Sequence, residues 1–271
     1  MNAIFLDTET TDNDVEKGAQ PIQIAWEVID IDHKEILEGD AMNLRPTVSI
    51  SPAATCVHGI SNEAMKKKVG LLTQDEGAEH LFSVFERYKP GYIIGHKINF
   101  DVEILKSLFS KSPIGIVFPE MKVIDTLRLA QKLIPLEKIG NHKQATVLYY
   151  LNQTEEQLQE VMTKSHDALA DIKMCKKMFL LLCKILSEKL GEKITLDRVL
   201  EYNLAPEIVE IWPFGNKHKG KKVVDVVIED PGYCNWFLTK TDLAERPDLA
   251  FTVRTLLEGK YPKKEVRTEF I

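Results

Sequence analysis

The stretch MNAIFLDTETT at residues 1–11 decides the fold, because it joins an apolar strand to two carboxylates. Residues 3–6 are apolar and lead into Asp7, a pattern that predicts a buried central strand with an acid at its end. Side chains two residues apart on a strand point to the same side, so we expect Asp7 and Glu9 to face one site. Two carboxylates so close repel each other unless a cation or a proton is present.

The rest of the first 190 residues predicts a strand hairpin followed by alternating helices and strands. Residues 22–31 alternate apolar and polar side chains, and residues 36–44 are expected to pair with them. Helices are expected over residues 75–88, 100–108, 144–151 and 167–190, and short strands over residues 92–95 and 123–124. This alternation is typical of an α/β domain in which helices pack on a mixed sheet.

The sequence pattern changes near residue 205, which indicates a second and smaller folding unit. We expect a main domain over residues 1–190, a linker over residues 191–205 and a small module over residues 206–271 that is α/β or mostly helical. Residues 206–271 contain 11 basic and 11 acidic residues, so the net charge of −6 belongs to the first part of the chain.

Composition and charge narrow the class of protein. Of the 271 residues, 44% are hydrophobic and 28% charged, as in folded globular domains. No apolar run approaches the ~20 residues of a membrane span, and the first residues lack the basic start of a signal peptide. The four cysteines form no C-x-x-C pair, which predicts reduced thiols in a cytoplasmic protein. The negative net charge argues against general attraction to nucleic acid, but bound cations can cancel a cluster of acids in a nuclease.

Two later motifs add acids and a histidine that could join Asp7 and Glu9. Asp101, in GHKINFD, opens a predicted helix, where it could also serve only to stabilise the helix N-terminus. In SHDALAD, the five steps from His166 to Asp171 would rotate by roughly 500° if helical. His166 must therefore lie in the loop before the helix if both side chains are to reach one site.

Each motif taken alone allows a simpler explanation. Asp7 and Glu9 could be solvated acids at the end of a strand, since charged residues are mostly exposed. Asp167 lies four residues before Asp171 and is a rival ligand or a helix cap. His166 could be an ordinary surface histidine, although an imidazole with a pKa near neutral is suited to accept a proton from an attacking water.

The four acids together predict a site for hard divalent cations. Oxygen-only ligands favour Mg²⁺ or Mn²⁺ over Zn²⁺. Two such ions roughly 4 Å apart can activate a water and stabilise the leaving oxygen of an in-line phosphoryl displacement. The predicted cofactors are therefore two Mg²⁺ or Mn²⁺ ions.

The motifs FLDTETT, GHKINFDVEIL and SHDALADIKMC, with SPAATCVHGIS between the first two, resemble in this order those of the DEDD superfamily of 3′–5′ exonucleases. The third motif carries a histidine, as in one subclass of that superfamily. The resemblance covers residues 1–186 and implies a ribonuclease H-like fold. It also implies two-metal hydrolysis that releases nucleoside 5′-monophosphates from a 3′ end.

The resemblance further implies roles for individual residues. Four acids would hold the metal ions and a histidine would be the general base: Asp7, Glu9, Asp101, Asp171 and His166. A second set would bind the terminal nucleotide or support the site: Thr8, Thr10, His58, Ile60 and Asn99. Asp125 matches another frequent position of the superfamily, and capping of the helix that follows it is the alternative.

Residues 214–236 resemble the small module that follows the exonuclease domain in exodeoxyribonuclease X-like proteins. The matching segments are FG at 214–215, HKGK at 218–221 and DPGY at 230–233, with Trp236. Four lysines surround Gly220: Lys217, Lys219, Lys221 and Lys222. With the aromatic residues that flank them, they could grip a phosphate backbone and stack bases. Alternatively, the aromatic residues are the core of a module of about 65 residues, which needs large apolar side chains to fold.

We therefore predict a 3′–5′ exonuclease that hydrolyses the phosphodiester bonds of DNA. One alternative is an RNA-processing exonuclease of the same superfamily, which only contacts to the 2′-hydroxyl would distinguish. Another is a catalytically silent module that binds nucleic acid or a partner protein, although such a module is expected to have lost at least one catalytic position. The predicted partner is nucleic acid, with DNA ahead of RNA.

Overall fold

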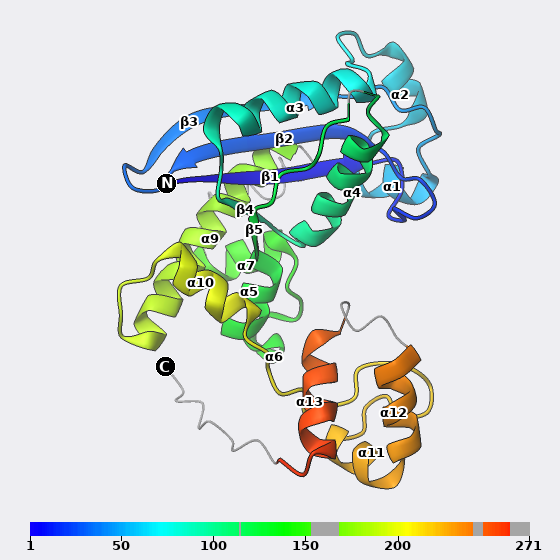
Figure 1. The fold of residues 1–271 in the computed structure, drawn as a ribbon, viewed down its shortest axis with the longest axis vertical. Coiled ribbons are helices and arrows are strands. Elements are labelled where there is room, and N and C mark those ends of the chain that lie inside the picture. Colours follow the sequence, from blue (N-terminus) through cyan, green and yellow to red (C-terminus); the bar gives the residue numbers. More distant parts are fainter. Residues whose placement is uncertain (114, 153–167, 241–245, 261–271) are drawn as a thin grey trace. The chain divides into compact units, whose positions relative to one another are not determined.

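The structure is a computed structural model and describes residues 1–113, 115–152, 168–240 and 246–260 (Figure 1). The chain divides into two compact units, Met1–Asn203 and Leu204–Ile271, close to the change of pattern expected near residue 205. Most of the segment expected as a linker is instead helix α10 (Leu196–Leu204). This helix belongs to the first unit because Leu196 and Val199 are buried in its core.

The first unit is built on a mixed five-stranded sheet with the strand order β3-β2-β1-β4-β5. The strands are β1 (Asn2–Thr10), β2 (Pro21–Asp30), β3 (Glu35–Asn43), β4 (Tyr92–Gly95) and β5 (Lys122–Asp125). β2 runs antiparallel to β1 and β3, whereas β4 runs parallel to β1 and β5. The central place of β1 and the hairpin of β2 and β3 agree with the sequence-based expectation.

Helices cover both faces of this sheet (Figure 1). One face carries α3 (Gln74–Tyr88) and α4 (Ile98–Lys111). The other face carries α5 (Thr126–Leu133), α7 (Gln144–Asn152), α9 (Ala168–Leu190) and α10. Successive side chains of β1 alternate between the two cores, with Ile4 on the α3–α4 side and Phe5 on the α9 side. The expected mixed sheet flanked by helices is thereby confirmed, and odd-numbered side chains of β1 point toward α9.

Three short helices of the first unit were not expected from the sequence. They are α1 (Pro52–His58), α2 (Asn62–Lys67) and α6 (Leu136–Ile139). The hydroxyls of Ser51 and Ser61 cap the first two by accepting hydrogen bonds from backbone N–H groups three residues on. Helices of one or two turns repeat the hydrophobic period too few times for the pattern to be recognised.

The second unit is mostly helical, which decides between the two alternatives for this module. It contains α11 (Val223–Glu229), α12 (Pro231–Lys240) and α13 (Pro247–Leu257), and an isolated bridge pairs Ile211 with Lys222. Trp212 and Phe237 are fully buried at its centre. Across the described parts of both units, the helices are too short or too polar to cross a membrane.

Candidate active site

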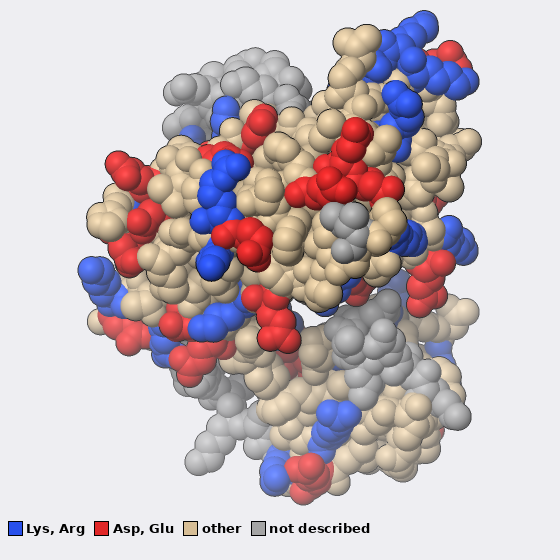
Figure 2. Space-filling model, turned by 45° about the horizontal axis from the view of Figure 1, so that its top comes forward, with Lys and Arg blue, Asp and Glu red and all other residues tan. Residues whose placement is uncertain are grey.

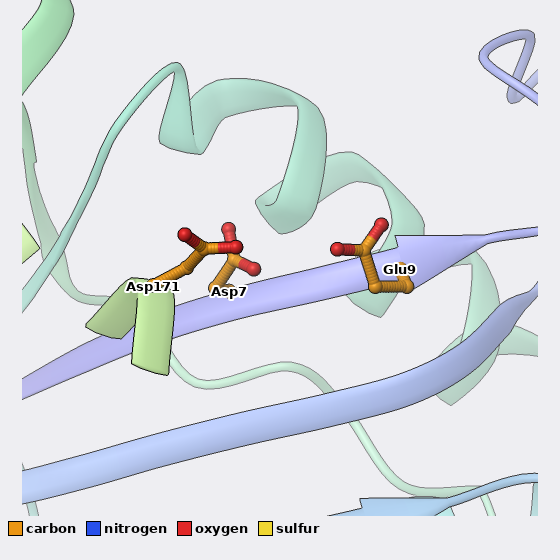
Figure 3. Close-up of side chains that lie close together, drawn as sticks. All are labelled: Asp7, Glu9 and Asp171. Carbon is orange, nitrogen blue, oxygen red and sulfur yellow. The ribbon is translucent and has the colours of Figure 1, made fainter. Parts of the chain in front are cut away.

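Strand β1 and helix α9 bring three carboxylates together. Asp7 and Glu9 lie on the face of β1 that points toward α9, and Asp171 lies in the first turn of that helix. Each of the three offers one carboxylate oxygen, and these oxygens all lie within 4.8 Å of one another. Figure 3 shows Asp171 opposite Asp7, with Glu9 farther along the strand on the same side. The structure thus places three of the four expected metal ligands in one group.

Asp101, the fourth acid, lies in the first turn of α4 and is buried. The backbone N–H and the hydroxyl of Thr8 donate hydrogen bonds of 2.9 and 2.6 Å to Oδ1 of Asp101. Because Thr8 lies between Asp7 and Glu9 on β1, these bonds hold the Asp101 carboxylate beside the other acids. The position at a helix N-terminus, considered as the simpler explanation, is therefore compatible with membership of the acid cluster.

The acids of this cluster disfavour one another's charged forms. Burial, followed by the charges of the three neighbouring acids, holds the pKa of Asp7 well above its usual value. Burial, followed by the charges of Asp171 and Asp101, raises the pKa of Glu9 to about 8. Burial also raises the pKa of Asp101 to about 7, although its hydrogen bonds with Thr8 oppose the rise. Protons or cations stabilise such a cluster, so the residues present fit a divalent metal ion.

Gln144, the first residue of α7, is a polar residue at the site that the sequence did not single out. Its Nε2 donates a 2.9 Å hydrogen bond to the backbone carbonyl of Asp171 and lies 3.5 Å from Oδ1 of the same residue. The amide therefore ties the start of α7 to the first turn of α9, which carries Asp171.

A cleft of about 350 Å³ opens beside the acids, between the end of β1, helix α1 and the start of α4. Thr8, Thr10 and His58, which were expected near the terminal nucleotide, are among the residues that line it. The other two residues expected there do not line it within the described part of the chain. Ile60 packs against a small apolar cluster, and Asn99 is exposed on α4.

Two histidines line this cleft, and both use their two ring nitrogens within the protein. Nε2 of His58 donates to the carbonyl oxygen of Thr10 at 3.1 Å, and its Nδ1 accepts from the N–H of Ile60 at 3.0 Å. His96, which the sequence did not single out, bonds a threonine hydroxyl at 3.1 Å and a backbone carbonyl at 2.9 Å. Burial lowers the pKa of His96 to about 4, so its ring is neutral. Neither ring is placed to take a proton from water.

Two further expectations have different outcomes. His166 and its rival Asp167 lie outside the described residues. Asp125 caps helix α5, because its Oδ1 accepts a 2.8 Å hydrogen bond from the N–H of Leu127. The same oxygen accepts a 2.8 Å bond from the N–H of Lys97. Asp125 thus has the capping role considered for it, and it also holds the segment that leads into α4.

The charge of the four lysines around Gly220 in the second unit is partly neutralised by neighbouring acids. Lys217 forms an ion pair of 2.5 Å with Asp230, just after α11, and Lys221 forms one of 3.2 Å with Glu229, the last residue of α11. Lys219 and Lys222 form no ion pair among the residues the structure describes. Four aromatic residues of this unit belong to its core or pack against it, as the alternative proposed: Trp212, Phe214, Tyr233 and Phe237. Trp236, in contrast, is 48% exposed.

Comparison with known proteins shows the family of this chain. The profile of the exonuclease family RNase_T matches residues 4–179. Over 239 residues the chain is 26% identical to exodeoxyribonuclease 10 of Escherichia coli strain K12, covering 86% of this chain and 93% of that protein. Over 177 residues it is 28% identical to the 3′–5′ exonuclease DinG of Bacillus subtilis strain 168. That match covers 65% of this chain but only 17% of DinG.

Solved structures of nucleases are similar to this chain, and exonuclease I shares its fold. Exonuclease I of E. coli in complex with a dT13 oligonucleotide is 20% identical, with a TM-score of 0.54, and the match covers 70% of this chain and 42% of that one. Exonuclease X in complex with 5′ overhanging duplex DNA is 22% identical, with a TM-score of 0.48, and the match covers 74% of this chain and 99% of that one. At 20% identity, the match to exonuclease I shows the fold alone.

The first unit is a nuclease domain, with helices on both faces of a mixed sheet and an acid cluster at the end of its central strand. The chain belongs to the exonuclease family, whose profile matches more than half of it. The expected class of enzyme, a 3′–5′ exonuclease hydrolase of ribonuclease H-like fold, is thereby confirmed. The family depends on divalent metal ions, in agreement with the acid cluster, and one solved complex of E. coli exonuclease I contains zinc.

Proposed function

We propose that this protein shortens DNA from its 3′ end and releases nucleoside 5′-monophosphates. The observation that carries the proposal is the cluster of acids at the end of β1, where Asp7, Glu9 and Asp171 lie together and Thr8 holds Asp101 beside them. The raised pKa values of Asp7, Glu9 and Asp101 agree with this crowding. DNA as the substrate is supported by exodeoxyribonuclease 10 of E. coli, a relative of which the match covers 93%. The dT13 complex of E. coli exonuclease I points the same way.

The acid cluster would hold two Mg²⁺ or Mn²⁺ ions. Its donors are carboxylate oxygens alone, which suits these cations. Asp7, Glu9 and Asp171 form one group of ligands, and Asp101 adds its carboxylate from α4. When bound, the ions supply an activated water and neutralise charge on the leaving oxygen. The two hydrogen bonds from Thr8 keep Asp101 oriented for this purpose.

His166 would be the general base that accepts a proton from the attacking water. This assignment rests on the third motif and on the engagement of the other two histidines near the acids. In both His58 and His96, the two ring nitrogens form hydrogen bonds with other groups of the protein. A neutral imidazole with a pKa near neutral is suited to this proton transfer.

The cleft beside the acids would receive the 3′-terminal nucleotide. Thr8, Thr10 and His58 line it, so the sugar and base of that nucleotide would lie against the end of β1 and helix α1. Ile60 and Asn99 would support the site from outside the cleft. Ile60 does so by donating its N–H to His58, which fixes the ring.

A digest of matched DNA and RNA oligonucleotides, each labelled at the 5′ end, tests the proposal. We expect a ladder that shortens DNA from the 3′ end with Mg²⁺ and that disappears with EDTA or in Asp7→Ala. If only the RNA oligonucleotide is shortened, the protein is an exoribonuclease. Binding without cleavage of either strand would favour a catalytically silent nucleic-acid-binding module.

We also propose that the protein is cytoplasmic. The structure pairs none of the four cysteines, and each is a free thiol. Such thiols are typical of a reducing compartment.

A further inference from the structure

Lys97 has an unusual backbone conformation at the edge of the cleft. Its φ of 64° and ψ of 32° lie in the left-handed region, which residues with a Cβ atom rarely adopt. It directly precedes α4, and its N–H donates to the Asp125 carboxylate at 2.8 Å. The junction between β4 and α4 therefore imposes this conformation. Residues other than glycine that are held in such conformations concentrate at functional sites.

The side chain of Lys97 is the basic group of an otherwise acidic cleft. Among the described residues that line the cleft, Lys97 is the only lysine or arginine, whereas four are acids: Asp7, Glu9, Asp12 and Asp101. The Lys97 amine lies 5.9 Å from the ring centre of Phe100, which also lines the cleft. It forms no ion pair with any acid in the described part of the chain. The amine is therefore available to an anion that enters the cleft.

We propose that Lys97 binds the phosphate of the nucleic-acid strand that lies next to the hydrolysed bond. This inference rests on the proposed function, because it requires a strand whose 3′ end reaches the acids. Metal ions bound by the acids would compensate the charge of the hydrolysed phosphate but not that of the next phosphate along the strand. The next phosphate would still face the carboxylates of the cleft, and a lysine ammonium provides the missing positive charge.

Asparagine is a suitable substitution at Lys97, because it tolerates the left-handed backbone conformation while it removes the ammonium group. We expect Lys97→Asn to raise the KM for a single-stranded DNA oligonucleotide about tenfold, with a smaller effect on kcat. The plot of log KM against log salt concentration should become shallower by about 0.7, the contribution of one phosphate contact in a single strand. Lys97→Arg keeps the charge and should retain most of the affinity.

Lys89 provides the control for the backbone. It also has a positive φ, of 42°, at the end of α3, but it does not line the cleft. Lys89→Asn therefore repeats the chemical change of Lys97→Asn away from the acids, and we expect it to leave the KM and its salt dependence as in the wild type. Equal values of KM for the Lys97→Asn and Lys89→Asn variants would overturn the proposal.

A small substrate separates this inference from the proposed function. The p-nitrophenyl ester of thymidine 5′-monophosphate contains one phosphate and no neighbouring phosphate. Hydrolysis of the ester and the oligonucleotide by the wild-type protein supports the proposed function, and hydrolysis of neither would refute both ideas. If Lys97 binds the neighbouring phosphate, Lys97→Asn raises the KM for the oligonucleotide much more than the KM for the ester. An equal rise for both substrates would overturn the assignment to the neighbouring phosphate.

Discussion

Asp7 and Asp101 belong to one acid cluster, but the protein holds the two residues by different means. Thr8 donates two hydrogen bonds to Asp101, whereas no described residue donates one to the Asp7 carboxylate. We expect Asp7→Ala and Asp101→Ala each to lower activity on DNA by roughly a thousandfold or more, because both remove a metal ligand. In metal-free protein, only Asp101→Ala should lower the free energy of unfolding, by about 1–3 kcal/mol, since the Thr8 donors lose their acceptor.

Urea unfolding in EDTA and the oligonucleotide digest measure these two effects separately. Asp101→Asn is the control, because its amide oxygen can still accept from Thr8 while the charge is lost. It should be inactive and nearly as stable as the wild type. A loss of stability in Asp7→Ala as large as in Asp101→Ala would contradict the difference in hydrogen bonding.

The raised pKa values make the stability of the metal-free protein depend on pH. Glu9 has a usual pKa of 4.5 and a pKa of about 8 in the folded protein. Between these values the folded state binds more protons than the unfolded state, so the free energy of unfolding falls as the pH rises from about 5 to about 8. The fall is expected to be on the order of a few kcal/mol, since one pKa unit corresponds to about 1.4 kcal/mol.

Thermal unfolding in EDTA across this pH range checks the direction of the effect. Addition of Mn²⁺ near pH 8 should raise the Tm, because the ion binds the folded state and takes the place of the protons. Glu9→Gln should flatten the pH dependence. A Tm in EDTA that increases steadily from about pH 5 to about pH 8 would refute the charge repulsion inferred for the cluster.

At the scale of elements, the two ends of strand β4 tolerate different amounts of bulk. A Cβ atom on Gly95 would lie 2.6 Å from Cδ1 of Ile98 and 2.7 Å from the carbonyl oxygen of Leu6. These contacts join β4 to β1 and α4, the elements that carry three of the four acids. A Cβ atom on Gly91, just before β4, would find only one atom within reach, the backbone oxygen of Asn2 at 4.0 Å.

We therefore expect Gly95→Ala to force β1 and α4 apart. The free energy of unfolding should decrease by about 1–3 kcal/mol, as for other overpacked sites. Activity should decrease as well, because the acids on β1 and α4 lose their spacing. Gly91→Ala is the control and should change stability by less than about 0.5 kcal/mol. Equal Tm and activity in the two variants would show that β4 adapts to the added methyl group.

The comparison of sequence and structure shows which elements could be predicted. Long segments with a clear period, such as β2 and α3, were recognised because each repeats its apolar pattern several times. The acids on β1 were placed on one face by the two-residue period of a strand. Gln144 and His96 were missed because only the tertiary fold brings them to their partners. The partner of Gln144 lies 27 residues away, and those of His96 lie 30 and 46 residues away.

At the scale of the whole molecule, nucleic-acid binding has to depend on local groups of basic side chains. The net charge is −6, and acidic and basic side chains are interspersed on the face shown in Figure 2. General attraction to a polyanion is therefore weak. Besides Lys97 in the first unit, the second unit offers Lys219 and Lys222, which lack ion pairs among the described residues. The exposed indole of Trp236 adds a surface on which a base can stack.

We expect these groups of the second unit to contribute to DNA binding by the full chain. Lys219→Glu and Lys222→Glu should each weaken binding of a single-stranded oligonucleotide several-fold, and each should make the salt dependence shallower by about 0.7. Fluorescence anisotropy in the Asp7→Ala background measures binding without hydrolysis. Lys260→Glu is the control, because this lysine of the same unit already pairs with Glu258 at 2.7 Å. If all three variants weaken binding equally, only the total charge matters, and the second unit serves to complete the fold rather than to hold DNA.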